Sequence, residues 1–571
     1  MDISVTQHER RAASARSLIT VLNFAASSHA RAIAVLLLVS LLAFLPGFFA
    51  IPPIDRDEAR FAQATKQMIE TGDYVDIRFQ DEVRYKKPVG IYWLQAGAVK
   101  AARALGFQRA LITIWLYRIP SLAGAIGAVL LTYWAALAFV TRRAAILAAL
   151  MMASSVLLGF ERLLATTDAV LLMTIVAAMG AMARAYLEVR ADSAATWLLA
   201  GVFWTAVAAG VLIKGPMIIM VVGLAAVALA VLDRSGRWFL ELKPIAGAIW
   251  FAVIVLPWFI AIIGRSGDAF LAESVGQDLL SKVFSAQEAH GAPPGYYFLL
   301  FWITFFPGAM LAGLAAPAVW ASRNEPPIKF LLAWLIPSWL LLEMIITKLP
   351  HYVLPLYPAI AILIAGVVER RALSHTRWLV WGTMWWFVLP VITGIGALVA
   401  LAVIGRQFGP LAWPLIGGAA VLGLLAWRLY EADGAEHSLL RAAAASVLMS
   451  IAVFSFVVPA LGYLFPAPAL ARLLQQSGCS QPLAAAAGYE EPSLVFLAGT
   501  GTQLTDSAGA AEFLRGGECR FALIESRHEK GFAQRAEAIG LRYTAGPRVE
   551  GLNFSTGQPV TIAVFRSREG S

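Results

Sequence analysis

The segment IDRDEARF at residues 54–61 concentrates charged side chains directly after an uncharged apolar run. Carboxylates in such a cluster can serve as general bases, and arginine can bind a phosphate through paired hydrogen bonds. Capping a helix that begins here is the alternative interpretation, but it needs only one acid. The crowding therefore favours a binding or catalytic site. Its charged members are Asp55, Arg56, Asp57, Glu58 and Arg60.

A second charged group, Lys86 and Lys87, stands at the start of KKPVGIYWLQAGAVKAARALG. The apolar spacing predicts an amphipathic helix there and another over DEARFAQATKQMIETG, which Gly72 ends. Such helices suit a membrane–water interface. A helix dipole disfavours cations at the N-terminus, so the two lysines indicate an anion between the helix starts. Phosphate is the natural candidate.

Further polar residues occur where other apolar runs begin or end. Asp168 precedes a long apolar run, where an N-cap role is the alternative, and Lys214 lies beside a Gly-Pro break, where its ammonium could also reach the interface by snorkelling. In TKLPHYVLPLYP the prolines exclude a regular helix, and irregular backbone at membrane depth is tolerated only around a cavity or inside protein. This last segment contributes Lys348, His351 and Tyr352.

The elements that position these residues are predicted to be membrane helices. The chain has 571 residues, 59% hydrophobic and 14% charged, with a mean hydropathy of +0.71. Soluble domains carry about 25% charged residues, so this composition indicates an integral membrane protein. We predict about thirteen spans, at roughly 32–51, 114–139, 144–160, 168–189, 196–213, 216–232, 245–264, 295–320, 328–347, 352–368, 378–402, 411–429 and 442–463.

The connecting segments alternate between short basic loops and loops that hold the polar clusters. The positive-inside rule assigns the basic set to the cytoplasm, so every candidate cluster falls on the outer side. This distribution of basic residues also explains the net charge of +9, so the charge does not indicate a nucleic-acid-binding protein. The outer set includes 52–113, the loop 265–294 and everything after 464. A disulfide between Cys479 and Cys519 is possible there, but the sequence leaves it open.

The composition changes near residue 466, which predicts two domains, 1–465 and 466–571. In the second domain PSLVFLAG, CRFALIES and VTIAVFRS are predicted as strands, and DSAGAAEFLRGG and KGFAQRAEAIG as helices. That alternation predicts a small α/β domain. Its glycine-containing AGTGTQ is weak evidence for nucleotide binding, and a structural or acceptor-docking role is favoured.

Four motifs in order along the chain resemble the lipid A aminoarabinose transferases: DEARF after the first span, KKP, the aspartate before the fourth span, and KLPHY. That family is grouped with the protein O-mannosyltransferases among glycosyltransferases of the GT-C fold. The resemblance covers about 460 residues. It implies a polytopic helical fold with an outer C-terminal domain, and a multi-pass protein of the bacterial inner membrane whose active site faces the periplasm.

The resemblance also implies an undecaprenyl-phosphate-linked sugar as donor and a lipid or glycan as acceptor. Matching the motifs residue by residue gives three sets of predicted roles, with Lys282 placed at a cation of the family's loop. We predict catalytic roles for Asp57, Glu58 and Asp168, binding of the donor phosphate by Arg60, Lys86, Lys87, Lys282 and Lys348, and binding of substrate by Asp55, His351 and Tyr352.

Two positions depart from the family pattern. The family usually has an acid where Lys86 stands and a tyrosine where Phe61 stands. A base at the first position puts aminoarabinose in doubt and favours a neutral or acidic sugar. No zinc-like ligand spacing occurs, and no cofactor is assigned, although acids such as Asp57 and Glu58 could hold a divalent cation. The alternatives are a protein O-mannosyltransferase, a ligase of lipid-linked glycans, and a lipid transporter or flippase.

Overall fold

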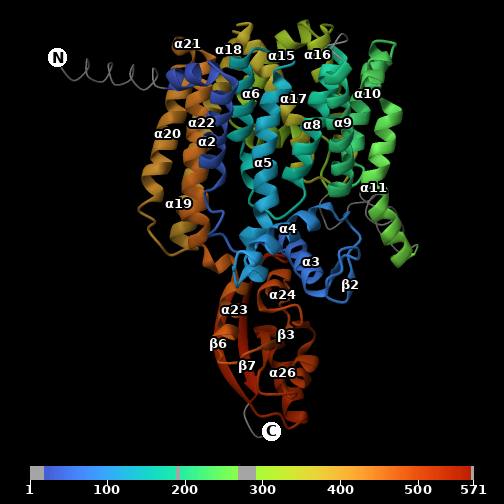
Figure 1. The fold of residues 1–571 in the computed structure, drawn as a ribbon. Helices are drawn as coiled ribbons and strands as arrows, with labels where there is room; N and C mark the ends of the chain where they lie inside the picture. Colours follow the sequence, from blue (N-terminus) through green and yellow to red (C-terminus); the bar gives the residue numbers. More distant parts are fainter. Residues whose placement is uncertain (1–17, 188–192, 268–269, 271–290, 568–571) are drawn as a thin grey trace, which may run out of the picture.

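A computed structural model describes residues 18–187, 193–267, 270 and 291–567. Most of these residues are helical, and the helices form one large bundle (Figure 1). A smaller domain with a β-sheet, formed by the end of the chain, lies beyond one end of that bundle. Helices α3 (Asp57–Thr71) and α4 (Gly90–Ala104) lie between the two parts, so the first charged segment is placed at their junction.

Eight apolar stretches in the described residues are long enough to cross a membrane, and a ninth counts if one bent pair is a single span. Burial of their apolar side chains against neighbouring helices explains why α5 (Ile114–Ala136) packs on α8 (Asp168–Leu187) and α8 on α9 (Ser193–Lys214). The eight are Ile114–Ala136 (α5), Asp168–Leu187 (α8), Thr196–Lys214 (in α9, Ser193–Lys214), Pro244–Ser266 (α11), Pro326–Met344 (α16), Pro350–Glu369 (η4, Pro350–Leu356, with α17, Tyr357–Glu369), Arg377–Val403 (α18, Arg377–Trp381, to α19, Trp385–Val403) and Ala435–Ala460 (beginning with α22, Ala435–Ile451).

The predicted number of thirteen spans is not reproduced by these long helices. Three predicted spans correspond to shorter apolar helices, α2 (His29–Phe44), α10 (Met217–Leu232) and α20 (Ala412–Arg428). The predicted span 295–320 is bent by 118° between α14 (Tyr296–Thr304) and α15 (Ala309–Ala321). The predicted span 144–160 is divided between α6 (Arg142–Ala153) and α7 (Val156–Glu161).

Breaks at the ends of the spans bring polar residues together. Gly215 adopts a φ of +64° between α9 and α10, a conformation that favours glycine, so the helix ends at Lys214. The prolines of the KLPHY segment give the 3₁₀ stretch η4 in place of a regular α-helix, as the sequence predicted. Helix α7 ends at Glu161, and α8 begins at Asp168.

Both helices predicted in the first outer segment are present. Helix α3 begins at Asp57 and ends at Gly72, whose left-handed conformation closes the helix as expected. Helix α4 begins at Gly90, so the two lysines precede its first turn. Two short strands, β1 (Arg78–Phe79) and β2 (Glu82–Val83), form a hairpin between the helices.

The C-terminal part contains a five-stranded sheet of order β4-β3-β5-β7-β6. Strands β3, β4 and β5 are parallel, and β7 pairs antiparallel with β5 and β6. The disulfide left open by the sequence is formed between Cys479 and Cys519. The elements are α23 (Pro466–Gln475), β3 (Leu483–Ala487), α24 (Pro492–Ala498), β4 (Gln503–Leu504), α25 (Ser507–Leu514), β5 (Arg520–Glu525), α26 (Glu529–Ala538), β6 (Tyr543–Asn553) and β7 (Gln558–Ser567).

One of the predicted strands is wrong. PSLVFLAG forms helix α24, because its apolar side chains pack on two sides, against the sheet and against α3. A short apolar run does not distinguish a strand from a buried helix. Phe496 of this helix is completely buried and meets the ring of Tyr117 at 5.2 Å, edge to face. The C-terminal domain therefore rests on α3 and on Tyr117 through a packed apolar contact.

Candidate functional site

A cavity of about 310 Å³ lies where the first outer segment meets the ends of several bundle helices. Nine residues predicted for the site from the sequence line it, although they come from four separate segments. Their shared cavity places positions 57 and 351 on the same side of the bundle. The nine are Asp55, Asp57, Glu58, Arg60, Lys86, Lys87, Asp168, His351 and Tyr352, and other lining residues include Arg56, Phe61, Arg84, Phe160, Glu161, Thr166, Thr167, Lys214, Thr347 and Leu349.

The lining of the cavity has an excess of positive charge. Six bases (Arg56, Arg60, Arg84, Lys86, Lys87 and Lys214) face five acids (Asp55, Asp57, Glu58, Glu161 and Asp168). One of these acids, Glu58, is neutralised by an arginine outside the lining. Fixed cations in a partly enclosed site stabilise an anion better than the same cations in water, so this cavity suits a phosphate group.

Asp57 is the acid of this segment that remains open to the cavity. Its side chain is 65% exposed, and its Oδ1 lies 3.9 Å from Nη2 of Arg84. The guanidinium of Arg84 lies over the ring of Phe61, 5.1 Å from the ring centroid, which fixes that cation beside the carboxylate. An exposed carboxylate with only a long contact can still accept a proton or a hydrogen bond from a substrate.

Glu58 has a different environment, although it was predicted to be catalytic. Its side chain is buried, and Arg118 of α5 donates from Nε to Oε1 at 2.7 Å and from Nη2 to Oε2 at 2.8 Å. The backbone N–H groups of Ala165 and Ile54 donate to the same two oxygens. These four hydrogen bonds occupy most of the acceptor capacity of the carboxylate. Its geometry therefore supports a positioning role.

Asp55 turns toward the C-terminal domain. Its carboxylate is buried and accepts a hydrogen bond of 2.9 Å from the backbone N–H of Ser493. Burial, with a smaller contribution from the nearby carboxylate of Glu491, raises the pKa of Asp55 to about 7. Glu491 in turn accepts hydrogen bonds from the backbone and hydroxyl of Ser555. Asp55 thus connects the cavity to the domain contact.

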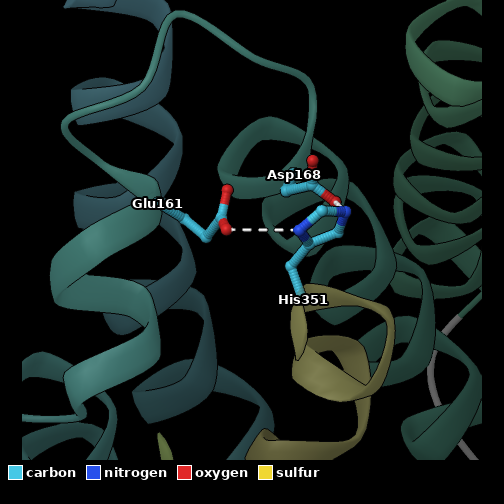
Figure 2. Close-up of side chains that lie close together, drawn as sticks. All are labelled: Glu161, Asp168 and His351. Atoms are coloured by element: carbon cyan, nitrogen blue, oxygen red, sulfur yellow. Dashed lines mark ion pairs between the residues drawn. The ribbon is translucent and has the colours of Figure 1, made fainter. Parts of the chain in front are cut away.

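The far wall of the cavity is formed by the three side chains of Figure 2, Glu161, Asp168 and His351. His351 from η4 lies between the two carboxylates, with Nδ1 3.4 Å from Oε1 of Glu161 and Nε2 3.7 Å from Oδ1 of Asp168. Lys214 at the end of α9 forms an ion pair with Oδ1 of Asp168 at 2.5 Å. Its ammonium also lies 5.3 Å from the ring centroid of Tyr352.

This wall is also where a metal ion could be held. Among the described residues, Glu161, Asp168 and His351 form a group whose ligand atoms all lie within 4.8 Å of one another. The acids suggested for a cation from the sequence, Asp57 and Glu58, are not part of it. Glu58 is unsuited because its oxygens are already hydrogen-bonded.

One predicted phosphate-binding residue, Lys348, does not line the cavity. Lys348 is buried, and its ammonium donates to the backbone carbonyl oxygens of Ala292 and Ile345 at 3.0 and 2.6 Å. These bonds hold the turn that follows α16, because a buried ammonium must find acceptors nearby. Lys282 lies outside the described residues.

Three residues of the site were missed by sequence reasoning. Arg118 is a single charge within a long apolar run, and such a residue usually has a buried partner in the bundle. Glu161 stands seven positions before Asp168, at the end of an apolar run, but only the aspartate was selected. Arg84 gave no signal, since isolated bases are common in loops.

A second, apolar cavity of about 510 Å³ adjoins the polar one. Phe160 lines both, so the two cavities are neighbours. The walls of the apolar cavity come from α2, α7, α14, α19, α22 and the helical segment Ala452–Val457 that follows α22. The lining residues include Phe44, Leu157, Ile303 and Phe454. The polar cavity with its basic residues thus lies beside a space that suits hydrocarbon.

Comparison with known proteins identifies relatives for most of the chain. Residues 59–266 match the family model of dolichyl-phosphate-mannose-protein mannosyltransferase. An undecaprenyl phosphate-alpha-4-amino-4-deoxy-L-arabinose arabinosyl transferase of Edwardsiella ictaluri (strain 93-146) is 26% identical over 432 residues, which are 71% of this chain and 72% of that protein. The corresponding protein of Yersinia pestis is 25% identical, with 71% and 72% covered.

The crystal structure of ArnT from Cupriavidus metallidurans bound to undecaprenyl phosphate superposes with a TM-score of 0.70. The match has 18% sequence identity and covers 93% of this chain and 97% of that one. The chain therefore has the GT-C fold of glycosyltransferases that use polyprenyl-phosphate sugars. Within that class it is similar to the aminoarabinose transferases, which confirms the resemblance inferred from the motifs.

Proposed function

We propose that this protein transfers a sugar from an undecaprenyl-phosphate-type lipid to an acceptor of the bacterial envelope. The observation that carries the proposal is the pairing of a basic polar cavity with an adjoining apolar one. A prenyl-phosphate sugar has the same division, with a long hydrocarbon tail next to an anionic phosphate. The solved structure of similar fold is described as bound to undecaprenyl phosphate, which supports this donor.

In the proposed reaction, Lys87 and Arg60 bind the donor phosphate, with Lys86 beside them. The bond between the anomeric carbon and the phosphate oxygen breaks, and the bond from the acceptor oxygen to the same carbon forms. The lysine and arginine stabilise the phosphate anion that leaves. Direct displacement inverts the anomeric centre. A hydroxyl acceptor gives its proton to Asp57, whose carboxylate is open to the cavity.

The remaining acids have supporting roles in this proposal. Glu58 holds the start of α3 against α5 and against the loop before α8, and so positions Asp57. Asp168, fixed by Lys214, orients the acceptor together with His351 and Tyr352. Lys348 maintains the turn before η4 and does not meet the phosphate.

We further propose that the site and the domain 466–571 face the periplasm, and that the domain contributes to acceptor docking beside the cavity. The Cys479–Cys519 disulfide suits an oxidising compartment. Because Lys86 adds a cation to the lining, the donor sugar is neutral or acidic, such as a uronic acid. A lipid A or other glycan acceptor is proposed from the similarity to the aminoarabinose transferases.

The proposal is tested with full-length protein in detergent and synthetic undecaprenyl-phosphate sugars, by following release of undecaprenyl phosphate. Lys87→Ala is expected to reduce transfer at least about 100-fold, because it removes stabilisation of the leaving phosphate. Lys100→Ala is the matched control, an exposed lysine on α4 that does not line the cavity. Wild-type activity in Lys87→Ala would remove the site assignment.

The sugar and acceptor are identified by mass spectrometry of envelope lipids, glycans and proteins from cells with and without the gene. Loss of a hexose, pentose or uronic acid from a lipid or glycan supports the proposal and names both substrates. Loss of a sugar from a protein instead would favour the mannosyltransferase alternative, which the family match over residues 59–266 keeps relevant.

A further inference from the structure

The most unusual feature of the cavity is its far wall, where Glu161, His351 and Asp168 meet (Figure 2). Both carboxylates are buried, and the imidazole between them is 21% exposed. The three side chains come from the end of α7, the start of α8 and η4. Two neighbouring segments and a third from much later in the sequence therefore converge on a volume small enough for one ion.

The hydrogen bonding of this wall is incomplete. The two nitrogen–oxygen separations of His351, 3.4 and 3.7 Å, are longer than the usual range of about 2.7–3.2 Å. Oε2 of Glu161 has no hydrogen-bond partner among the residues that the structure describes, although the side chain is only 3% exposed. A buried carboxylate oxygen of this kind requires a partner, and a metal ion is one that three converging ligands can hold.

We propose that Glu161, Asp168 and His351 bind a divalent transition-metal ion of the zinc type. Imidazole and carboxylate together suit such ions, whereas magnesium and calcium prefer oxygen ligands alone. Ligand atoms around tetrahedral zinc lie about 3.3 Å apart at the usual bond lengths. The Glu161–His351 separation of 3.4 Å already matches that spacing, and the remaining ligand atoms lie within 4.8 Å.

Charge supports the same assignment. The two carboxylates outnumber the single ammonium of Lys214, so the wall is net negative when the imidazole is neutral. A dication makes it net positive and compatible with the phosphate that the opposite wall is proposed to bind. Lys214 donates to Oδ1 of Asp168, and the second carboxylate oxygen, Oδ2, accepts a long contact of 3.4 Å from the hydroxyl of Thr167.

This metal site deepens the proposed function and rests on it for its chemical role, though not for its existence. A metal ion beside the acceptor-orienting residues would bind the acceptor oxygen and lower its pKa, so that Asp57 removes the proton more easily. Glu161 becomes a ligand that sequence reasoning did not select. His351 changes from a residue that contacts substrate to one that holds the ion.

The test measures the amount of zinc bound by the full-length protein in detergent. The protein is first treated with EDTA and dialysed, and it is then titrated with zinc. Elemental analysis by mass spectrometry and the visible spectrum of bound Co²⁺ report stoichiometry and ligand geometry. We expect about one ion per chain in the wild type and at least a tenfold weaker affinity in His351→Ala and Glu161→Gln. His375→Ala, an exposed histidine away from the cavity, is the matched control and is expected to bind like the wild type.

Glu161→Gln preserves the shape of the side chain and guards against a loss of binding through misfolding. Zinc should raise the thermal unfolding temperature of the wild type and not that of the folded variant. Wild-type protein without stoichiometric zinc, or His351→Ala with unchanged affinity, would overturn the site. Zinc binding without sugar transfer removes the proposed function and leaves the metal site, whereas sugar transfer by a wild-type protein that binds no zinc removes the metal site and leaves the proposed function.

Discussion

The three acids of the segment IDRDEARF lie in two opposite environments. Asp55 and Glu58 are buried, and both accept hydrogen bonds from backbone N–H groups far away in the sequence. Asp57 lies between them, lines the cavity and has a side chain that is 65% exposed to solvent. Three acids within four positions thus have different roles. Two carboxylates hold the structure, and the third is open to a substrate.

The difference shows that hydrogen-bond saturation, rather than charge, separates the two kinds of acid. A carboxylate that already accepts four hydrogen bonds, as Glu58 does, has little capacity left for a substrate. A carboxylate with one contact at 3.9 Å has nearly all of its capacity left. The predictions below test this division, beginning with the largest expected effect.

Breaking the Glu58–Arg118 pair is expected to destabilise the protein most. Glu58→Ala leaves a completely buried guanidinium without its carboxylate, and removing one partner of a buried pair costs about 3–5 kcal/mol. We expect a lower thermal unfolding temperature and a smaller yield of monodisperse protein in detergent. Glu82→Ala, an exposed glutamate on β2, is the control and should behave as wild type. Equal stability of Glu58→Ala and wild type would contradict the structural role.

Asp57→Asn should give the opposite result, with loss of transfer and unchanged stability. Loss of a general base lowers the rate by about 10²–10⁴-fold, whereas an exposed substitution changes stability by less than about 0.5 kcal/mol. Asp55→Asn is the paired variant, expected to keep most of the transfer activity because its carboxylate faces Ser493. Initial rates with a hydroxyl acceptor check both. A larger loss of activity in Asp55→Asn than in Asp57→Asn would reverse the division.

The sequence predicted the local elements of this region well. Apolar spacing gave α3 and α4, and Gly72 was correctly expected to end the first helix. It also gave the break at the prolines of η4. These features depend on neighbouring residues only, and so a single sequence contains them. The resemblance of four motifs, spread along the chain, to a known family predicted the GT-C fold. The comparison with a solved structure confirms that fold.

The partners of individual charges could not be predicted in the same way. Lys348 was assigned to the phosphate from the resemblance of KLPHY to the family motif, but its ammonium donates to backbone carbonyl groups. Helix α24 was predicted as a strand from its short apolar run. The prediction failed because the burial of this segment depends on α3, which lies more than 400 residues earlier. Glu161 and Arg118 acquire their roles only when distant helices meet. Such contacts are set by tertiary packing, which local patterns do not specify.

The contact between Asp55 and the C-terminal domain predicts a dependence of stability on pH. The pKa of Asp55 is about 7 in the folded protein and about 4 in an unfolded chain, so the folded state favours the protonated form. The contribution of Asp55 to the free energy of unfolding is therefore fully present below about pH 4 and is lost as the pH rises toward 7. The loss amounts to a few kcal/mol in the free energy of unfolding. We expect Asp55→Asn to remove this decline, because asparagine stays neutral and still accepts from Ser493.

Thermal unfolding of the two proteins between pH 5 and pH 8 tests this expectation, since the difference between them cancels the other titrating groups. The wild type should lose stability relative to Asp55→Asn as the pH rises, and the difference should level off above about pH 7. A constant difference across that range would place the Asp55 carboxylate in contact with water. The contrast with Asp57 would then have to rest on activity alone.

The smallest expected effect concerns Arg56, the residue that turns the chain between the buried acid and the exposed one. Arg56 has a φ of +68°, a conformation that favours glycine, and it stands between Asp55 and Asp57. Its Nη2 donates to the backbone oxygen of Ser555, a contact that is exposed to solvent.

Arg56→Gly and Arg56→Ala both remove this bond, but only glycine relieves the backbone strain. We expect the glycine variant to be more stable than the alanine variant by about 1 kcal/mol, measured as thermal unfolding under one condition. If alanine is equally stable, the positive φ is not maintained at a cost, and the separation of the two acids must be produced by the bonds of Asp55 and Glu58 instead.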